Sequence, residues 1–221
     1  MNPIIIIPAY NPPDLFPQLI TRLYKITAIP IIVIDDGSVP LIYLKNSKLT
    51  LLRNSNNRGK GYSLVKAFHY SYNRGYSHAV TLDADFQHDP QLLDSFMKIH
   101  EDISIVLGRR NFKREMPIHR RLSNKITSSI ISYICGKRIL DSQCGYRRYK
   151  LSDVCSETFI ENGFQFESEV LIKLLIGNKT SLQHLTIPTI YDRENTSMNN
   201  IWDTIRFIRL IIRTIFKYSD H

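Results

Sequence analysis

The sequence has few cysteines, no long apolar run and no familiar glycine-rich nucleotide loop. Its three cysteines, Cys135, Cys144 and Cys155, are an odd number without metal-ligand spacing. A disulfide framework is therefore not expected, and a reducing compartment fits the composition. No apolar stretch reaches the roughly 20 residues that span a bilayer. The first apolar run, residues 4–7, follows no basic segment and ends at Pro8, which predicts a core strand and not a signal peptide.

Two nucleotide-binding signatures are also missing. Residues 57–61 read Asn-Arg-Gly-Lys-Gly, which resembles a phosphate loop but lacks the Gly-Lys-Ser/Thr ending of a Walker A motif. No Gly-x-Gly-x-x-Gly follows the first apolar run. These absences argue against a P-loop NTPase and against a dinucleotide-dependent oxidoreductase.

The net charge of +9 is concentrated in one segment. Residues 108–150 contain twelve Lys or Arg against Glu115 and Asp141, a local charge of +10 that leaves −1 for the rest of the chain. Such a block predicts a polyanionic partner, either phosphates, a membrane surface or nucleic acid. The aromatic residues are not interleaved as in an RNA or single-strand module, so nucleic acid is not expected. The structural alternative is a solvated helix face.

Short apolar runs alternate with helical patterns in the first half. Strands are predicted over residues 4–7, 31–34, 49–52, 79–82 and 103–107. Helices are predicted over residues 15–26 with Asp14 as N-cap, over residues 61–72, and after Pro90. This alternation predicts an α/β fold with a mostly parallel sheet flanked by helices.

The second half predicts helices over residues 118–134, 165–176 and 201–218, and short strands over residues 145–149 and 182–187. The last helix has a basic stripe beside an apolar face, and the stripe consists of Arg206, Arg209, Arg213 and Lys217. A basic amphipathic helix lies in a membrane interface or packs on its own domain with the arginines in water. We therefore divide the chain into a domain of residues 1–199 and a C-terminal basic amphipathic helix of residues 200–221.

Four polar clusters lie at the predicted carboxyl ends of strands, where ligands bind in sheets of this kind. They are residues 8–11 (Pro-Ala-Tyr-Asn), 35–38 (Asp-Asp-Gly-Ser), 83–85 (Asp-Ala-Asp) and 108–110 (Gly-Arg-Arg). The clusters predict one site at one edge of the sheet. Taken singly, each is also explained as a turn.

Asp83 and Asp85 point the same way on an extended segment. Two neighbouring carboxylates repel each other unless a cation lies between them. A hard divalent ion, Mg²⁺ or Mn²⁺, would fill that place and would also bind a diphosphate. Gln87 continues the spacing and is predicted as a further metal ligand.

In order and spacing, four segments resemble the family 2 glycosyltransferases, most closely the dolichyl- and polyprenyl-phosphate sugar transferase branch. They are residues 7–11, 33–38, 54–61 and 82–90, the last reading Leu-Asp-Ala-Asp-Phe-Gln-His-Asp-Pro. The resemblance covers roughly the first 200 residues. It implies a GT-A fold, a nucleotide-diphosphate-sugar donor and inversion at the anomeric carbon.

The resemblance also implies site residues. Asp83 and Asp85 would hold the metal, Arg110 would face the phosphates, and Asp141 would lie near the acceptor. The nucleotide pocket would be formed by Pro8, Ala9, Tyr10, Asn11, Asp35, Asp36, Lys60, Asp83 and Ala84. Arg193 resembles an arginine on the acceptor loop, but the Gly and Lys that follow it in the family are missing here.

The implied reaction is an in-line displacement. A hydroxyl acceptor needs a general base, whereas a phosphate acceptor is already ionised. Glu167 and Glu169 are the candidates, and on a helix they point about 200° apart, so at most one faces the cleft. Glu169 resembles the family's glutamate and is the predicted base.

The expectation is a metal-dependent hexosyltransferase that uses a lipid-phosphate or lipid-linked glycan acceptor in cell-surface polysaccharide or glycolipid synthesis. We expect it in the cytoplasm, with peripheral contact to the cytoplasmic membrane face and without nucleic acid. The alternative is a nucleotide-binding relative with a regulatory or scaffolding role, which the altered loop after Arg193 would explain. A nucleic-acid binder is a third and weaker interpretation.

Overall fold

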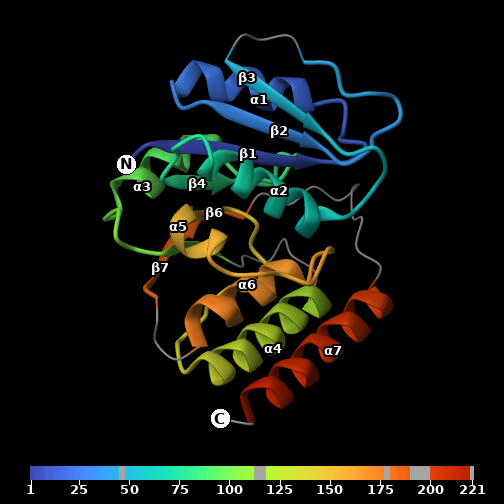
Figure 1. Ribbon diagram of the computed structural model, residues 1–221, viewed down its shortest axis with the longest axis vertical. Helices are drawn as coiled ribbons and strands as arrows, with labels where there is room; N and C mark the ends of the chain where they lie inside the picture. The colour runs from blue at the N-terminus through green and yellow to red at the C-terminus, as the bar shows by residue number, and fades with distance from the viewer. Residues whose placement is uncertain (45–47, 112–117, 177–179, 190–199, 220–221) are drawn as a thin grey trace.

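One seven-stranded sheet organises the protein, with strand order β3-β2-β1-β4-β6-β5-β7 (Figure 1). The computed structural model describes residues 1–44, 48–111, 118–176, 180–189 and 200–219. The strands are β1 (Pro3–Ala9), β2 (Ile31–Asp35), β3 (Leu49–Arg53), β4 (His78–Thr81), β5 (Ile105–Arg110), β6 (Arg147–Lys150) and β7 (Leu182–Ile187). The helices are α1 (Phe16–Ile26), α2 (Lys60–Tyr72), α3 (Leu93–Lys98) after a 3₁₀ turn (Pro90–Leu92), α4 (Ile118–Cys135), α5 (Leu151–Cys155), α6 (Phe166–Leu175) and α7 (Asn200–Ser219).

The sheet is mostly parallel, as the alternation of strands and helices predicts. Strands β1 to β4 are parallel to their neighbours in this group, and β5 is parallel to β7. Strand β6 is antiparallel to both β4 and β5 and joins the two parallel groups. The α/β prediction is therefore confirmed, and β6 adds a reversal that the sequence pattern does not predict.

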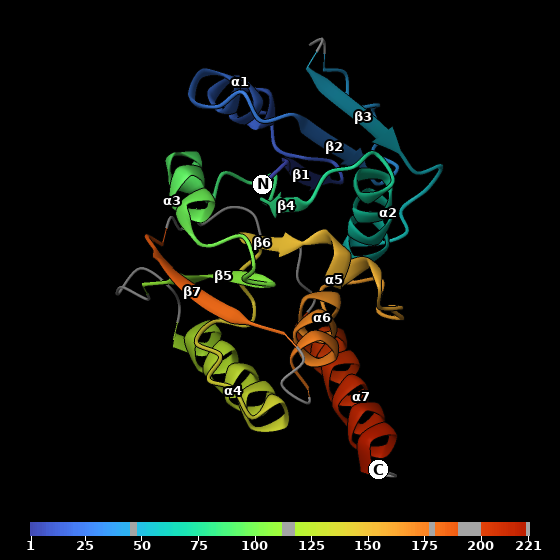
Figure 2. The same ribbon diagram turned by 60° about the vertical axis from the view of Figure 1, so that its left-hand side comes forward.

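Helices cover both faces of the sheet. Alternate residues of β1 enter opposite cores: Ile4 and Ile6 pack with residues of α2, α4, α5 and α6, whereas Ile5 and Ile7 pack with α1 and α3. Figure 2 shows α1 and α3 on one side of the sheet and α2, α5 and α6 on the other. Continuous apolar runs are thus explained by strands that are buried on both faces.

Three local predictions differ from the structure. Leu15, not Asp14, is the N-cap of α1, and Pro17 follows in the first turn, where its missing N–H costs no helical hydrogen bond. Strand β5 continues to Arg110 because residues 108–110 pair with β7. Pro8, Ala9 and Asp35 likewise end their strands and do not follow them.

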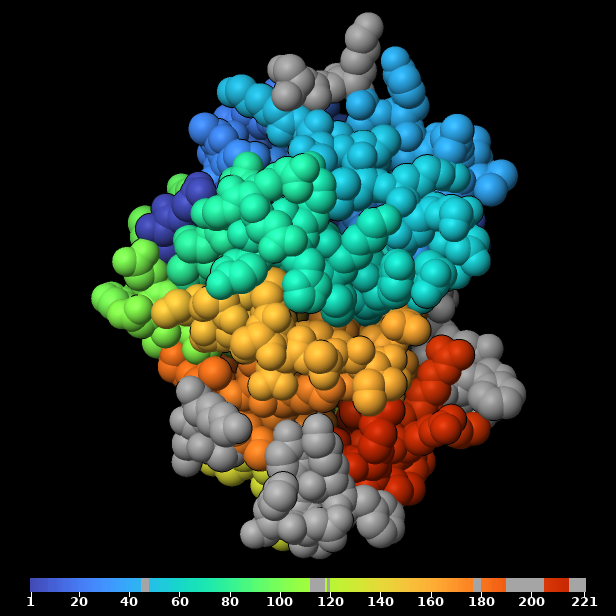
Figure 3. All heavy atoms as spheres, in the orientation of Figure 1, coloured from blue at the N-terminus to red at the C-terminus, as the bar shows by residue number. Residues whose placement is uncertain are grey.

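Helix α7 confirms the predicted C-terminal helix. It packs on the domain through Leu210, which is 2% exposed and belongs to the same core as α6. In the space-filling view, its described part lies beside the segment that leads into α6 (Figure 3). The division into residues 1–199 and 200–221 stays a prediction. Among the described helices, none is long and apolar enough to cross a membrane.

Candidate active site

The end of β1 presents a half-exposed aromatic ring at the carboxyl edge of the sheet. Tyr10 is 51% exposed and directly follows Ala9, the last residue of the strand. The backbone then turns through Asn11, whose φ of 43° is unusual for a residue with a side chain. Asn11 is held there because its N–H donates to Ser38 and its side-chain oxygen accepts from the Val39 N–H. The turn fixes Tyr10 beside the end of β2.

Asp35 and Asp36 are both buried and shape the neighbouring loops. Asp35 accepts hydrogen bonds from the Ser38 N–H at 2.8 Å and from the Arg53 guanidinium. Asp36 accepts from the backbone N–H groups of Arg58 and Gly59 at 3.0 and 2.7 Å. Both carboxylates therefore fix the shape of the predicted nucleotide pocket, and all four of their oxygens already accept hydrogen bonds from the protein.

Lys60 connects two carboxylates that come from distant parts of the chain. Its Nζ lies 2.5 Å from Asp83 Oδ1 and 2.7 Å from Glu167 Oε1. Burial alone would lower the pKa of Lys60, but the two carboxylates outweigh it and raise that pKa. Burial would raise the pKa of Asp83, and Lys60 with His88 holds it well below its usual range. The three groups form a compact charged cluster.

Asp83 is enclosed on its other side. Its Oδ2 lies 3.2 Å from His88 Nε2, and the His88 ring packs 5.3 Å from the ring of Tyr146. A Cβ on Gly145 would lie 2.3 Å from Asp83 Oδ2, so only glycine fits the backbone at that position. The carboxylate is thus held between Lys60 at the start of α2, His88 in the segment after β4, and Gly145 in the turn before β6.

Asp85 has a different environment from Asp83. Among the described residues, no Lys or Arg forms an ion pair with it, and its Oδ1 accepts from the Gln87 N–H at 3.1 Å. Burial, and next the negative charge of Asp83, raises the pKa of Asp85. An additional cation near both carboxylates would relieve this repulsion.

The residues present fit a divalent metal that is shared with a diphosphate. Among the described residues, no group of three His, Cys, Asp or Glu could hold a metal ion. Mg²⁺ is commonly bound by one or two carboxylates together with substrate phosphates, so a pair of carboxylates suffices. The roles predicted for Asp83, Asp85 and Gln87 are compatible with this arrangement and stay predictions.

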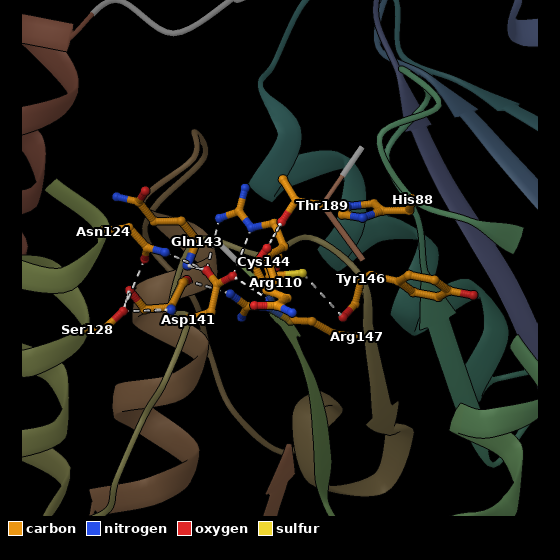
Figure 4. A network of polar contacts seen from close by, with 12 residues as sticks. His88, Arg110, Asn124, Ser128, Asp141, Gln143, Cys144, Tyr146, Arg147 and Thr189 are labelled. Atoms are coloured by element: carbon orange, nitrogen blue, oxygen red, sulfur yellow. Dashed lines mark hydrogen bonds and ion pairs between the residues drawn. The ribbon is translucent and has the colours of Figure 1, made fainter. Parts of the chain in front are cut away.

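Arg110 and Asp141 form a second charged group (Figure 4). Asp141 is fully buried and accepts from Arg110 Nε at 2.8 Å, from Arg110 Nη2 at 2.9 Å and from Asn124 on α4 at 2.8 Å. Burial would raise the pKa of Asp141, but the Arg110 guanidinium outweighs it and lowers that pKa. The structure therefore brings the predicted Arg110 and Asp141 together, with Asp141 orienting Arg110.

Arg147 ties this second group to the first. Its guanidinium is fully buried and donates to the carbonyl oxygens of Cys144, Ser142 and Glu167 at 2.7, 2.7 and 2.8 Å. One side chain thus fixes the turn after Asp141 and the start of α6. This role of Arg147 is not predicted from the sequence, because the pattern of residues does not show which carbonyls a buried arginine reaches.

Glu169 does not join the charged cluster around Asp83. It is buried, accepts from the N–H groups of Ile160 and Glu161, and pairs with Lys173 at 2.9 Å. It lines a small cavity between α6 and α7 together with Arg213. The helix therefore separates the two glutamates, as its period predicts, and it is Glu167 that meets Lys60. A base role for Glu169 stays a prediction, and its contacts favour Glu167 instead.

The predicted acceptor-loop residue Arg193 lies outside the described residues. Ala84 lies between the two aspartates and packs against the core on the α1 side. His88 and Gly145 are members of the site that the sequence analysis did not assign. His88 lies within the quoted resemblance, but only its distance to Asp83 marks it as part of the site.

Comparisons with known proteins point to one family. The profile described as glycosyl transferase family 2 matches residues 4–218. An uncharacterised protein of Methanocaldococcus jannaschii is 30% identical over 96% of this chain and 99% of its own length. The UDP-N-acetylglucosamine–dolichyl-phosphate N-acetylglucosaminyltransferase of Methanococcus voltae is 28% identical over 85% of each chain.

Solved structures show the same fold. The glucosyl-3-phosphoglycerate synthase from Mycobacterium tuberculosis, in complex with Mn²⁺, UDP and phosphoglyceric acid, superposes with a TM-score of 0.70. The match covers 97% of this chain and 77% of that one at 14% identity. The same synthase with Mg²⁺ and UDP gives a TM-score of 0.71 at 14% identity, over 97% and 78% of the two chains. The mixed sheet flanked by helices is therefore of the GT-A type.

Proposed function

Because the chain belongs to glycosyl transferase family 2, we propose that it transfers a sugar from a nucleotide-diphosphate sugar to a polyprenyl-phosphate acceptor with inversion. That it is a glycosyltransferase follows from the family. The observation that carries the finer proposal is the pair Asp83 and Asp85 at the carboxyl edge, beside Lys60. The acceptor class is supported by the relative from Methanococcus voltae, which is named for transfer to dolichyl phosphate.

The donor lies along the ends of β1, β2 and β4 in this proposal. Pro8, Ala9, Tyr10 and Asn11 line the base and ribose side, where Tyr10 offers an exposed ring for stacking. Asp35 and Asp36 fix the loops, as their buried contacts support. The diphosphate lies against Lys60, Asp83, Ala84 and Asp85, with Gln87 beside them.

The metal that this site would bind is Mg²⁺ or Mn²⁺, held by Asp83, Asp85 and Gln87. When bound, such an ion neutralises charge that develops on the departing diphosphate. Arg110 supplies further positive charge, and Asp141 holds its guanidinium in place. Arg193 is proposed as an additional contact to the acceptor.

The chemistry is one displacement at the anomeric carbon. An acceptor oxygen forms the new C–O bond while the bond to the diphosphate breaks, and the nucleoside diphosphate leaves with the electron pair. A phosphate acceptor is already ionised and needs no base. For a hydroxyl acceptor, Glu167 is the better placed carboxylate and would accept the proton of the attacking hydroxyl, with Lys60 2.7 Å away as its hydrogen-bond donor.

Two helices supply the proposed membrane contact. Exposed apolar residues recur along one face of α4 and along α7, namely Ile118, Leu122, Ile126, Ile205, Ile208 and Ile212. Helix α4 contains Arg120, Arg121 and Lys125 and no acidic residue. Apolar residues flanked by positive charge favour binding to anionic lipid.

Vesicle sedimentation tests this contact. We expect binding to phosphatidylcholine vesicles that contain phosphatidylglycerol and much weaker binding without it. The double variant Leu122→Asn/Ile126→Asn should bind less, whereas Leu41→Asn, an exposed residue between β2 and β3, should bind as wild type. Equal binding of all three proteins would refute the assigned surface.

Transfer assays test the function itself. Wild-type protein is incubated with UDP-, GDP- and dTDP-sugars, Mn²⁺ or Mg²⁺, and either a polyprenyl phosphate or a glycan acceptor. We expect transfer to the lipid phosphate and a fall of about two to three orders of magnitude in Asp85→Ala. Asp94→Ala, an exposed carboxylate on α3, is the control. Tight nucleotide binding without turnover on any acceptor would favour the non-catalytic alternative.

A further inference from the structure

Lys60 holds the carboxylate that the proposed metal site needs. Its side chain is 16% exposed, and its ammonium lies between the side chains of Asp83, which is 27% exposed, and Glu167, which is 8% exposed. A buried ammonium that loses a partner carries a large desolvation cost. Any cation that binds Asp83 therefore has to compete with Lys60 for the same oxygens.

The backbone around Lys60 is fixed, so only its side chain can give way. The Gly59 N–H donates to Asp36 at 2.7 Å, and the Gly61 N–H donates to the Asn162 carbonyl at 2.6 Å. A Cβ on Gly59 would lie 2.3 Å from that same carbonyl oxygen. Helix α2 thus starts in close contact with the segment before α6, and Lys60 stays within reach of Asp83.

The other contacts of Asp83 are less able to move. His88 approaches Oδ2 with a ring that packs against Tyr146, and Gly145 closes the space beside it. The flexible side chain of Lys60 is the contact that can exchange. A divalent ion attracts Asp83 with twice the charge of the ammonium, but binding it leaves Lys60 with Glu167 as its remaining carboxylate.

We propose that Lys60 and the divalent metal compete for Asp83, so that the metal binds tightly only together with a nucleoside diphosphate. The inference rests on the proposed metal site. The incoming diphosphate supplies the negative charge that Lys60 loses when it leaves Asp83. Metal and nucleotide therefore bind with positive coupling, and each increases the affinity of the other by the same factor. Lys60 thereby protects the free enzyme from holding metal without donor.

Mn²⁺ binding measures this competition directly, without turnover. Free Mn²⁺ is followed by electron paramagnetic resonance in wild type and in Lys60→Met, with and without UDP or GDP. Methionine keeps much of the length and removes the charge. We expect Lys60→Met to bind Mn²⁺ alone about tenfold more tightly than wild type, and to lose most of the gain from nucleotide.

Three variants keep the test specific. Lys66→Met removes another lysine of α2, which donates to Arg53 and Asn54 and not to Asp83, and should match wild type. Lys60→Arg keeps the charge and should keep weak Mn²⁺ binding without nucleotide. The double variant Lys60→Met/Asp83→Asn should lose the gained affinity, which assigns it to Asp83. Thermal melting confirms that each variant is folded.

The outcomes separate the inference from the function. If Lys60→Met binds Mn²⁺ alone no more tightly than wild type, while both bind it with nucleotide, the competition is refuted and the metal site stands. If no protein binds Mn²⁺ even with nucleotide, the proposed metal site itself fails.

Discussion

The two sides of the site are built in different ways. In residues 1–98, polar residues lie at or just after the ends of β1, β2 and β4, so Asp35 and Asp83 reach the site because of their place at the end of a strand. In residues 105–187, the buried Asp141 is assembled with Arg110 from β5 and Asn124 from α4. The first region is therefore organised by local sequence, and the second by long-range contacts between elements.

This difference has a consequence for substitutions. A residue of the first region acts where its strand places it, so its loss removes one group. A residue of the second region holds several segments together, so its loss displaces the other site residues on those segments. We expect the largest effects of substitution where the two regions are in contact.

Gly145 and Asp83 form a tight contact between the regions, since a Cβ on Gly145 would lie 2.3 Å from the carboxylate. In Gly145→Ala, we expect transfer to fall by about two orders of magnitude or more and the free energy of unfolding to fall by about 1–3 kcal/mol. Gly75→Ala is the control, with φ +79° but no atom within 4 Å of its Cβ. It should lose about 1 kcal/mol from backbone strain and keep its activity. Full activity in Gly145→Ala would show that Asp83 moves freely.

Arg147 and Arg148 are neighbouring, fully buried residues of β6 with opposite surroundings. Arg148 donates to the carbonyls of Phe96, Ile99 and His100 at the end of α3, away from Asp83. Replacing either arginine by Met leaves carbonyl oxygens without a donor, and each variant should lose about 3 kcal/mol in urea unfolding. Only Arg147→Met should also lower kcat, because Arg147 binds the Glu167 backbone. Equal kcat in the two variants would contradict the positioning role.

Glu167 and Glu169 give a smaller and more selective contrast. We expect Glu167→Gln to lower transfer to a hydroxyl acceptor by about a hundredfold. Transfer to a polyprenyl phosphate needs no base and should fall by only about tenfold, because Lys60 loses its ion pair with Glu167. Glu169→Gln should weaken stability by about 2 kcal/mol, because Lys173 loses its carboxylate, while transfer stays near wild type. Initial rates with each acceptor and a thermal melt measure these effects. A larger loss of transfer in Glu169→Gln than in Glu167→Gln would support Glu169 as the base.

The smallest effect is on acid stability. The pKa of Asp141 is lowered in the folded protein, so the stabilisation from its pair with Arg110 is present above the unfolded pKa near 4. It is lost as the pH falls through the lower, folded pKa of Asp141. Unfolding followed by circular dichroism between about pH 2 and 6 should show a smaller loss of stability with acid in Asp141→Asn than in wild type. An identical acid profile would mean that Asp141 does not provide this stabilisation.

The first region was largely predictable from sequence. Continuous apolar runs fix the strands of a two-sided sheet, and a polar cluster after each run then predicts the site edge, as at Asp83. The helical period also predicts that Glu167 and Glu169 face apart. It does not predict which of them meets Lys60, because that depends on how α6 docks, with Phe166 buried in the core.

The second region was less predictable for a physical reason. The direction of β6 cannot be predicted from a strand of four residues. A buried arginine such as Arg147 cannot be distinguished from an exposed one by sequence, because its carbonyl partners come from distant segments. The start of α1 was also predicted wrongly. Asp14 is a favoured N-cap residue, but Leu15 is the N-cap and Pro17 lies in the first turn.

The reversed strand β6 also has a consequence for how the protein forms. Residues 78–81 pair with residues 147–150, and residues 105–107 pair with 147–149. A chain emerging from the ribosome can complete the parallel pairs of its first four strands before β6 exists, whereas the carboxylate at the end of β4 gains its neighbouring turn only after Arg147 has been synthesised. Long sequence separation slows such closure. The contacts around Asp83 are therefore completed late in folding, and amide exchange at β6 reports when they form.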